Sequence, residues 1–254
     1  MFSFTLGNSF SLFHEQLGAD ALPLEMLWVE NGTFLMGSPP TEEGRSTTLE
    51  ERFQLTLTDG FWLGKYPVTQ SQWQYVMDSN QSHFQEGGTN RPVENVDWSD
   101  SLAFCESLNL RFRDELPAQY RFSLPTEGHW EYACRAGTTT PHYNGTTEKE
   151  LGEIAWYSKN SNNSTQPVGQ KKPNAWGFHD MLGNVGEWCY DALAYYPQQS
   201  TSNWYGTEDP LARMVRGCGY AETESYDVRA ADRSYIEPHI RRPWFGFRLC
   251  LLSL

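Results

Sequence analysis

The stretch after residue 138 limits the fold most, because no long apolar or periodic segment remains there. Gly, Pro, Asn and Ser recur between short apolar stretches, which is typical of loops and brief strands. Even so, aromatic residues make up 15% of the chain, including ten Trp, at a mean hydropathy of −0.62. Such a composition indicates large rings buried inside a loop-rich domain, not a disordered chain.

Helices are predicted only before residue 138. Thr69 is a good N-cap for a first helix, and a second is expected after Ser99 with an apolar stripe from Leu102 to Phe112. A third begins after Thr126 and ends at Gly137, the residue type that commonly follows a helix.

Strands are expected on either side of these helices. Residues 22–38 predict two short strands around a hairpin turn at Asn31-Gly32, and residues 53–69 alternate like a further strand. Residues 1–21 have no clear pattern and are expected to be an N-terminal extension to one domain over residues 22–254. The predicted fold class is α+β, with few helices, short antiparallel strands and much irregular loop.

Charge and cysteine content exclude several classes of protein. The net charge of −13 argues against a nucleic-acid partner or an anionic membrane surface, because there is no excess cation to replace counterions. No apolar stretch is long enough to span a bilayer, and the first residues lack the basic and apolar regions of a signal peptide. The five Cys are widely spaced without a CxxC pair, which favours neither zinc nor a disulfide framework.

Motifs for phosphate binding, dinucleotide binding, zinc proteolysis and serine hydrolysis are absent from the sequence. One stretch, residues 180–188, combines two carboxylates, an Asn and glycines. Hard oxygen donors of this kind suit Ca²⁺. The alternative is a tight turn in which Asn184 and Glu187 bond to neighbouring amides while Trp188 fills the core. The residues alone favour the turn.

Seven blocks of the sequence occur together in one order. They resemble the formylglycine-generating-enzyme (sulfatase-modifying factor) domain, over roughly residues 22–251, and seven collinear blocks are more specific than any one motif. The resemblance implies a C-type lectin fold. The blocks are NGTFLMGS (31–38), FWLGKYPVTQSQW (61–73), RPVENVDWSDSLAFC (91–105), YRFSLPTEGHWEYACRAGT (120–138), PVGQKKPNAWGFHDMLGNVGEWCYD (167–191), MVRG (214–217) and GFRL (246–249).

The resemblance also bears on metals. The family holds a calcium through side chains and backbone carbonyls at positions that match Asp180, Gly183, Val185 and Glu187. A second calcium site of the family falls at residues 153–156, where Ile154 stands in place of the family's Asn. The resemblance thus implies one calcium as the candidate cofactor. The function predicted below requires no cofactor.

The catalytic cysteines of the family have no counterpart here. The enzymes bind copper through two thiolates after a Gly-Gly-Ser block, which in this chain is Gly217-Cys218-Gly219, and the matching thiol positions are Glu222 and Asp227. Copper(I) prefers soft thiolates to hard carboxylates, and Cys218 alone cannot supply two. A copper-dependent formylglycine-generating enzyme, or a related oxygen-dependent enzyme of sulfur chemistry, is therefore kept only as the alternative function.

The same domain resembles the variable proteins of diversity-generating retroelements, including treponemal surface proteins. In those proteins a C-terminal segment, here about residues 214–254, is mutated at adenines while a frame of residues stays fixed. The frame corresponds to Arg216, Gly217, Arg229, Ala231, Arg233, Pro238, Arg241, Gly246, Phe247 and Arg248. The candidate variable, ligand-binding residues are Tyr220, Glu222, Ser225, Tyr226, Asp227, Asp232, Ser234, Tyr235, Ile236, His239, Arg242, Pro243 and Trp244.

Residue chemistry supports the same division. Seven of the fourteen Arg lie between Arg213 and Arg248, and no Lys follows Lys172. Arginine is preferred where a planar fork ties several acceptors in fixed geometry, while Tyr, Trp, Ser, Asp and His resemble the chemistry of antibody loops. The predicted function is a non-enzymatic variable protein at a bacterial cell surface, with an unknown macromolecular ligand, expected to be a protein. A plain structural or adaptor domain is the other alternative.

Overall fold

The computed structural model describes residues 8–13 and 15–253, and within these ranges it contains four helices and three sheets. This arrangement confirms the α+β class. The helices are α1 (Gln70–Met77), α2 (Trp98–Arg111), α3 (Glu127–Arg135) and α4 (Glu148–Ile154). The strands are β1 (Ser9–Leu12), β2 (Leu24–Val29), β3 (Gly32–Met36), β4 (Phe53–Leu57), β5 (Phe61–Gly64), β6 (Tyr120–Ser123), β7 (Gly186–Leu193), β8 (Thr201–Ser202), β9 (Asp209–Arg216), β10 (Ser234–Ile236), β11 (Phe245–Gly246) and β12 (Cys250–Ser253).

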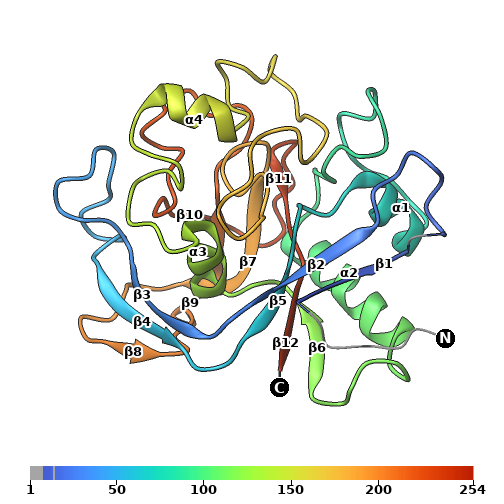
Figure 1. Ribbon diagram of the computed structural model, residues 1–254, viewed down its shortest axis with the longest axis horizontal. Helices are drawn as coiled ribbons and strands as arrows, with labels where there is room; N and C mark the ends of the chain where they lie inside the picture. Colours follow the sequence, from blue (N-terminus) through green and yellow to red (C-terminus); the bar gives the residue numbers. More distant parts are fainter. Residues whose placement is uncertain (1–7, 14, 254) are drawn as a thin grey trace.

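The largest sheet joins the two ends of the described chain. Its strand order is β1-β2-β5-β12-β6, and all four pairings are antiparallel. Figure 1 shows β12, in dark red, between β5 in blue-green and β6 in green. The strand that follows the proposed variable residues is therefore an inner strand of the sheet.

The proposed variable segment contributes to a second sheet, of order β10-β9-β7-β11, in which only the short β11–β7 pairing is parallel. A third sheet, β3-β4-β8, lies on the other side of α3, which contacts β3 and β4 as well as β7 and β9 (Figure 1). Because α3 is enclosed, its Trp130, Ala133 and Cys134 are fully buried, in agreement with the predicted apolar stripe.

Local signals located the first three helices correctly. Thr69 and Thr126 are the N-caps of α1 and α3, and each side chain accepts a hydrogen bond from a backbone N–H in the first turn. The second helix begins earlier than predicted, with Asp97 as its N-cap. The prediction that no helix follows residue 138 is wrong, because Thr147 caps α4 and forms a capping box with Glu150.

Two predictions about the N-terminal third need correction. The strands β2 and β3 exist, but they do not form a hairpin, since β2 pairs with β1 and β5 while β3 pairs with β4. Gly32 opens β3 at a place where a Cβ atom would lie 2.2 Å from the Tyr132 hydroxyl, so a larger residue there would require the Tyr132 side chain to shift. Within the predicted extension, β1 is a regular strand, and Leu12 and Leu17 are buried.

The placement of residues 1–7 lies outside the described residues, and the domain boundary at residue 22 stays a prediction. In the described ranges no helix combines the length and the apolar character that crossing a bilayer requires.

Candidate ligand-binding face

The last part of the chain begins at the end of β9, where Gly217 takes a left-handed φ of +88°. A Cβ atom there would lie 2.7 Å from the Met181 carbonyl oxygen, so glycine is required both for the turn and for the close approach. From this turn residues 218–233 run as a loop, β10 follows, and a second loop leads to β11. Both loops lack long stretches of secondary structure, so other contacts must hold them.

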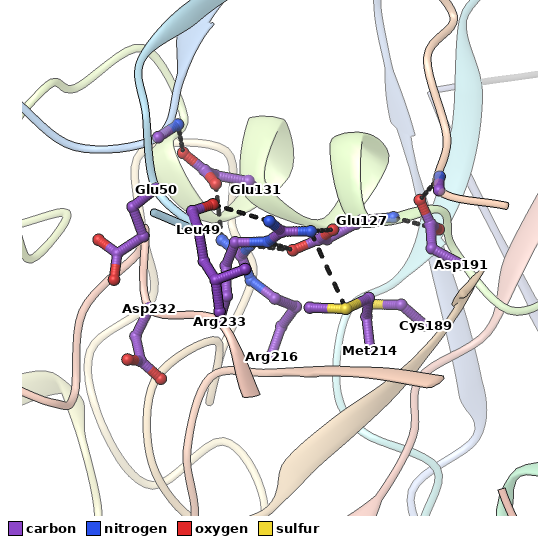
Figure 2. Close-up of polar contacts among 12 residues, drawn as sticks. Leu49, Glu50, Glu127, Glu131, Cys189, Asp191, Met214, Arg216, Asp232 and Arg233 are labelled. Atoms are coloured by element: carbon purple, nitrogen blue, oxygen red, sulfur yellow. Dashed lines mark hydrogen bonds and ion pairs between the residues drawn. The ribbon is translucent and has the colours of Figure 1, made fainter. Parts of the chain in front are cut away.

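Arg216 and Arg233 hold the base of the first loop to the first turn of α3. Both bind Glu127: Arg233 Nε lies 2.6 Å from Oε1, and Arg216 Nη1 lies 2.7 Å from the same oxygen. Arg216 also binds Glu131 one helical turn later, at 2.6 Å. Arg233 donates to the carbonyl oxygens of Leu49 and Ala194 as well. Figure 2 shows this cluster beside α3.

The charges of this cluster compensate one another. Burial raises the pKa of the Glu127 carboxyl, but the two guanidinium groups of Arg233 and Arg216 outweigh burial, so the pKa lies below its usual value. Since Glu127 is fully buried, its charge depends on both arginines, and loss of either partner leaves a buried ion incompletely paired. The cluster therefore ties the two ends of the first loop to α3.

Arg229 fixes the middle of the first loop to a distant one. Its guanidinium binds Glu50 through two contacts of 2.8 and 3.0 Å, binds Glu42 at 2.7 Å, and donates to the Gly44 carbonyl oxygen. Arg241 plays the same part in the second loop, with two 2.8 Å hydrogen bonds to the Asp100 carboxylate in α2. The prediction that arginine forks hold the irregular loops is confirmed by these contacts.

Arg248 bears directly on the expected calcium. Its guanidinium forms a two-pronged pair with Glu187 at 2.6 and 2.7 Å and also donates to the carbonyl oxygens of Gly64, His179 and Asp180. The indole of Trp130 donates to Glu187 at 2.7 Å. The cation next to Glu187 is thus an arginine, and both carboxylate oxygens already have donors.

The other three positions expected to bind calcium lie close by along the same turn. Asp180 accepts a hydrogen bond from the Gly169 amide through Oδ2, while its buried Oδ1 has no partner among the described residues. Burial raises the pKa of Asp180 to about 6. Gly183 and Val185 would contribute only carbonyl oxygens. With both Glu187 oxygens engaged, the four residues do not fit calcium as a set.

The turn alternative describes part of this stretch well. The Asn184 side chain exchanges two hydrogen bonds with the backbone of Gln166, and Trp188 is fully buried. At the family's second calcium position, Ile154 is buried and Glu153 forms an ion pair with Lys172. The chemistry of this stretch is therefore that of a packed turn.

Cys218, the displaced thiol, faces acceptors. Its Sγ lies 3.1 Å from the Asp227 carbonyl oxygen and 3.3 Å from Asp232 Oδ2. Burial and then the charges of Asp232 and Glu222 raise the pKa of this thiol well above its usual value. A neutral thiol beside carboxylates is a poor ligand for copper(I). All five Cys are free thiols, and the other four are buried.

The thirteen predicted ligand-binding residues fall into three groups by exposure. The exposed group contains Tyr226, Ser234, Tyr235, His239, Arg242 and Trp244. The half-buried group contains Glu222, Ser225, Asp227, Asp232, Ile236 and Pro243. Tyr220 alone is buried, at 4% exposure, with its ring edge-on to Phe84 at 5.3 Å. The prediction that the Tyr220 side chain is displayed is therefore wrong, because its ring is part of the interior.

Backbone hydrogen bonds fix both loops that carry the displayed residues to neighbouring parts of the chain. The second loop rests on the start of α2, where the amides of Asn95 and Trp98 donate to the carbonyl oxygens of Arg242 and Pro238. The first loop is fixed at the Glu222 carbonyl oxygen, which accepts a hydrogen bond from the Ser158 amide. The exposed side chains project from loops whose backbones are tied down.

Sequence reasoning missed the carboxylates that hold the arginines. Glu127 and Glu131 lie four residues apart in α3, and both are fully buried. Two acidic residues on the apolar side of a predicted helix were an available signal for buried cationic partners, since buried carboxylates are normally paired. Glu42 and Glu50 carried no comparable signal, because they lie in an irregular loop.

Comparison with known proteins agrees with this architecture. A family model described as the sulfatase-modifying factor enzyme 1-like domain matches residues 15–251. The chaperone protein LppX of Paenibacillus barcinonensis is 30% identical over 227 residues, which cover 71% of this chain and 75% of that protein. The formylglycine-generating enzyme of Streptomyces coelicolor is 32% identical over 178 residues, covering 64% of this chain. The match spans 53% of that enzyme, about half its length.

Two solved structures are similar over nearly the whole chain. Treponema denticola variable protein 1 superimposes with a TM-score of 0.83 at 28% identity, covering 95% of this chain and 98% of that one. PvdO from Pseudomonas aeruginosa superimposes with a TM-score of 0.78 at 25% identity, covering 91% of this chain and 95% of PvdO. The expected resemblances, both to the enzyme domain and to a treponemal variable protein, are confirmed, and with them the fold type.

Proposed function

Because the chain belongs to the sulfatase-modifying factor enzyme 1-like domain family, we propose that it is a non-catalytic member that binds a macromolecular ligand through changeable side chains. The observation that carries the proposal is the contrast within residues 216–248. Four arginines of the frame, Arg216, Arg229, Arg233 and Arg248, are buried in ion pairs, while side chains between them are exposed. Similarity to a variable protein of Treponema denticola supports it.

The binding face comprises the six exposed residues of the predicted set. Tyr226, Tyr235 and Trp244 are 40%, 50% and 36% exposed and offer large amphipathic surfaces, and the remaining three offer adaptable hydrogen bonds. This mixture suits recognition of a protein surface. A cell-surface location and diversification by a retroelement are parts of the same proposal.

The flanking DNA tests the retroelement. We expect a near-copy of the 3′ end of the gene, with adenines at the codons of the exposed residues, beside a reverse-transcriptase gene. Related strains should differ at these codons and share the codons of Arg216 and Arg233. Changes spread evenly along the gene, with no such copy nearby, would refute diversification.

A display experiment tests the binding face directly. The six exposed positions are randomised together on the yeast surface, and folding is scored by resistance to protease. A matched library randomises six buried residues of the frame. We expect most members of the first library to stay folded and few of the second. The first library should then yield binders to a basic test protein such as lysozyme. Equal loss of folding in the two libraries would contradict a frame that is independent of the displayed residues.

The enzyme alternative makes a separate prediction. A copper oxidase of this family should bind one copper(I) tightly, whereas Glu222 and Asp227 occupy the thiol positions. Copper(I) titration against a competing chelator distinguishes the two. We expect no stoichiometric binding, and a tight 1:1 complex lost on Cys218→Ala would instead support the enzyme.

A further inference from the structure

A groove of about 700 Å³ lies outside the predicted variable segment, between α2 and the strands β6 and β12. Its walls are Leu102 and Ala103 of α2, Phe122 of β6 and Leu252 of β12, with Tyr190 and Tyr205 also lining it. The volume is in the range of pockets that hold small organic ligands, roughly 300–1,000 Å³. The lining is mainly apolar, and the tyrosine side chains are 43% and 49% exposed.

Charged groups at the groove are already paired. Arg121 and Glu106, which both line it, form an ion pair of 2.6 Å. Asp100, one residue after Ser99 of the lining, is bound by Arg241. An apolar wall with no unpaired charge among these groups favours an uncharged apolar occupant over a charged one. The chain as a whole carries a net charge of −13, which attracts a partner of positive charge.

The groove lies beside the loop that carries His239 and Arg242 of the proposed binding face, because the Trp98 amide donates to the Pro238 carbonyl oxygen and Ser99, the next residue, lines the groove. On paired antiparallel strands, Ile236 of β10 lies opposite Arg213 of β9, so these two side chains share one face of the sheet. The Arg213 guanidinium lies 4.1 Å from the ring centre of Trp98, and the Trp98 ring is 6.2 Å from that of Tyr190. A row of contacts thus also joins Ile236, a half-buried candidate residue, to the groove wall.

We propose that this groove is a constant subsite of the binding face, which receives an apolar side chain, aromatic or aliphatic, from an extended segment of a basic protein ligand. The inference rests on the proposed function. None of the thirteen candidate variable residues lines the groove, so diversification leaves it unchanged. Different variants then share one apolar anchor, while the displayed residues select among ligands that carry it. Affinity common to all variants comes from the groove, and specificity comes from the loops.

The first test uses N-acetyl-tryptophanamide as the probe and saturation-transfer NMR on the full chain. Ala103→Trp fills the groove from an exposed position on α2. Leu110→Trp places the same side chain on the same helix, at a residue 64% exposed and outside the groove. We expect Ala103→Trp to weaken probe binding at least about tenfold, a difference well resolved by titration, and Leu110→Trp to leave it unchanged. Indole-3-acetate, the anionic analogue, should bind more weakly than the neutral probe.

Unchanged probe binding in Ala103→Trp overturns the inference, as does absence of probe binding by the unmodified chain. Thermal melting verifies that the variant is folded. If it is not, Tyr190→Ser is the second variant, with the same expected loss.

The second test places Ala103→Trp and Leu110→Trp in binders selected from the displayed library. We expect the first substitution to weaken most of them and the second to weaken none, and equal effects would overturn the subsite. The triple variant Tyr226→Ala, Tyr235→Ala, Trp244→Ala should still bind the small probe. Failure of the library to yield binders, with probe binding intact, would refute the proposed function alone. Binders insensitive to Ala103→Trp would refute the subsite alone.

Discussion

Replacing Arg233 by Met should lower the free energy of unfolding far more than replacing Arg121 by Met. Both arginines contact a glutamate at 2.6 Å, Arg233 with Glu127 and Arg121 with Glu106. The first pair is buried, at 0% side-chain exposure on both sides, and the second is about half exposed. The shortest distance is matched, and the pairs differ in burial and in the additional hydrogen bonds that burial brings to Arg233.

The magnitude follows from what the substitution leaves behind. Without Arg233, the Glu127 carboxylate keeps only the charge of Arg216, and the Leu49 and Ala194 carbonyl oxygens lose a donor. Breaking a buried ion pair from one side costs about 3–5 kcal/mol, a large share of a typical stability of about 5–15 kcal/mol. At about 2–4 °C per kcal/mol for a chain of this size, Tm should fall by about 6–20 °C.

Thermal denaturation followed by circular dichroism, with urea unfolding as a second measure, tests the difference. Arg121→Met removes an exposed pair and should cost at most about 1 kcal/mol, or a few degrees. Equal shifts in the two variants would refute the argument that buried arginines form the frame. So would a Tm for Arg233→Met within two degrees or so of the unmodified chain, since even the lower bound is about 6 °C.

Four further predictions follow from the structure. Burial, and then the charge of Glu127, raises the pKa of Asp191 to about 7 from 3.8. The folded state therefore binds the Asp191 proton more tightly than the unfolded state does. Stability should therefore fall as pH rises from about 4 to about 7, and Asp191→Asn should flatten the slope of unfolding free energy against pH in that window; parallel slopes would contradict it. Because Arg248 occupies Glu187, millimolar calcium should leave Tm unchanged, whereas a rise of several degrees removed by chelator would show a site. The raised thiol pKa of Cys218 predicts slow reaction with a disulfide reagent at pH 8 in the folded protein and fast reaction in urea; equal rates would show a reactive thiol. The triple alanine variant of the three exposed rings should keep Tm within about 6 °C, at about 0.5 kcal/mol for each surface substitution, and a larger loss would assign those rings to the core.

Local chemistry explains what could be predicted from the sequence. Thr69 and Thr126 start helices because their side chains accept first-turn amides, an interaction within three residues. The seven-residue α4 escaped notice because Leu151 and Ile154 are its buried residues and the rest of it is largely polar. A helix of that length is set mainly by its cap and by packing.

Long-range pairing explains which features could not be predicted from the sequence. The Asn31-Gly32 pair is a strong hairpin signal, yet β2 pairs with β5 instead, over residues that a turn rule does not consider. In the site, the arginines of the frame were identified by the resemblance to variable proteins, and the number of arginines after residue 213 supported the assignment. Glu50, which binds Arg229 across 179 residues of sequence, could not be assigned, because sequence distance says nothing about which carboxylate meets which guanidinium.

The position of β12 has a consequence for how such a protein is produced. β12 is translated after every proposed variable codon, yet it fills the slot between β5 and β6. A copying error that shifts the reading frame within residues 219–244 removes this strand and leaves two strand edges open to water and to aggregation. Only in-frame substitution yields a product that completes its largest sheet. Under the proposed diversification, folding itself would thus screen each rewritten copy, because a chain without β12 leaves that sheet incomplete.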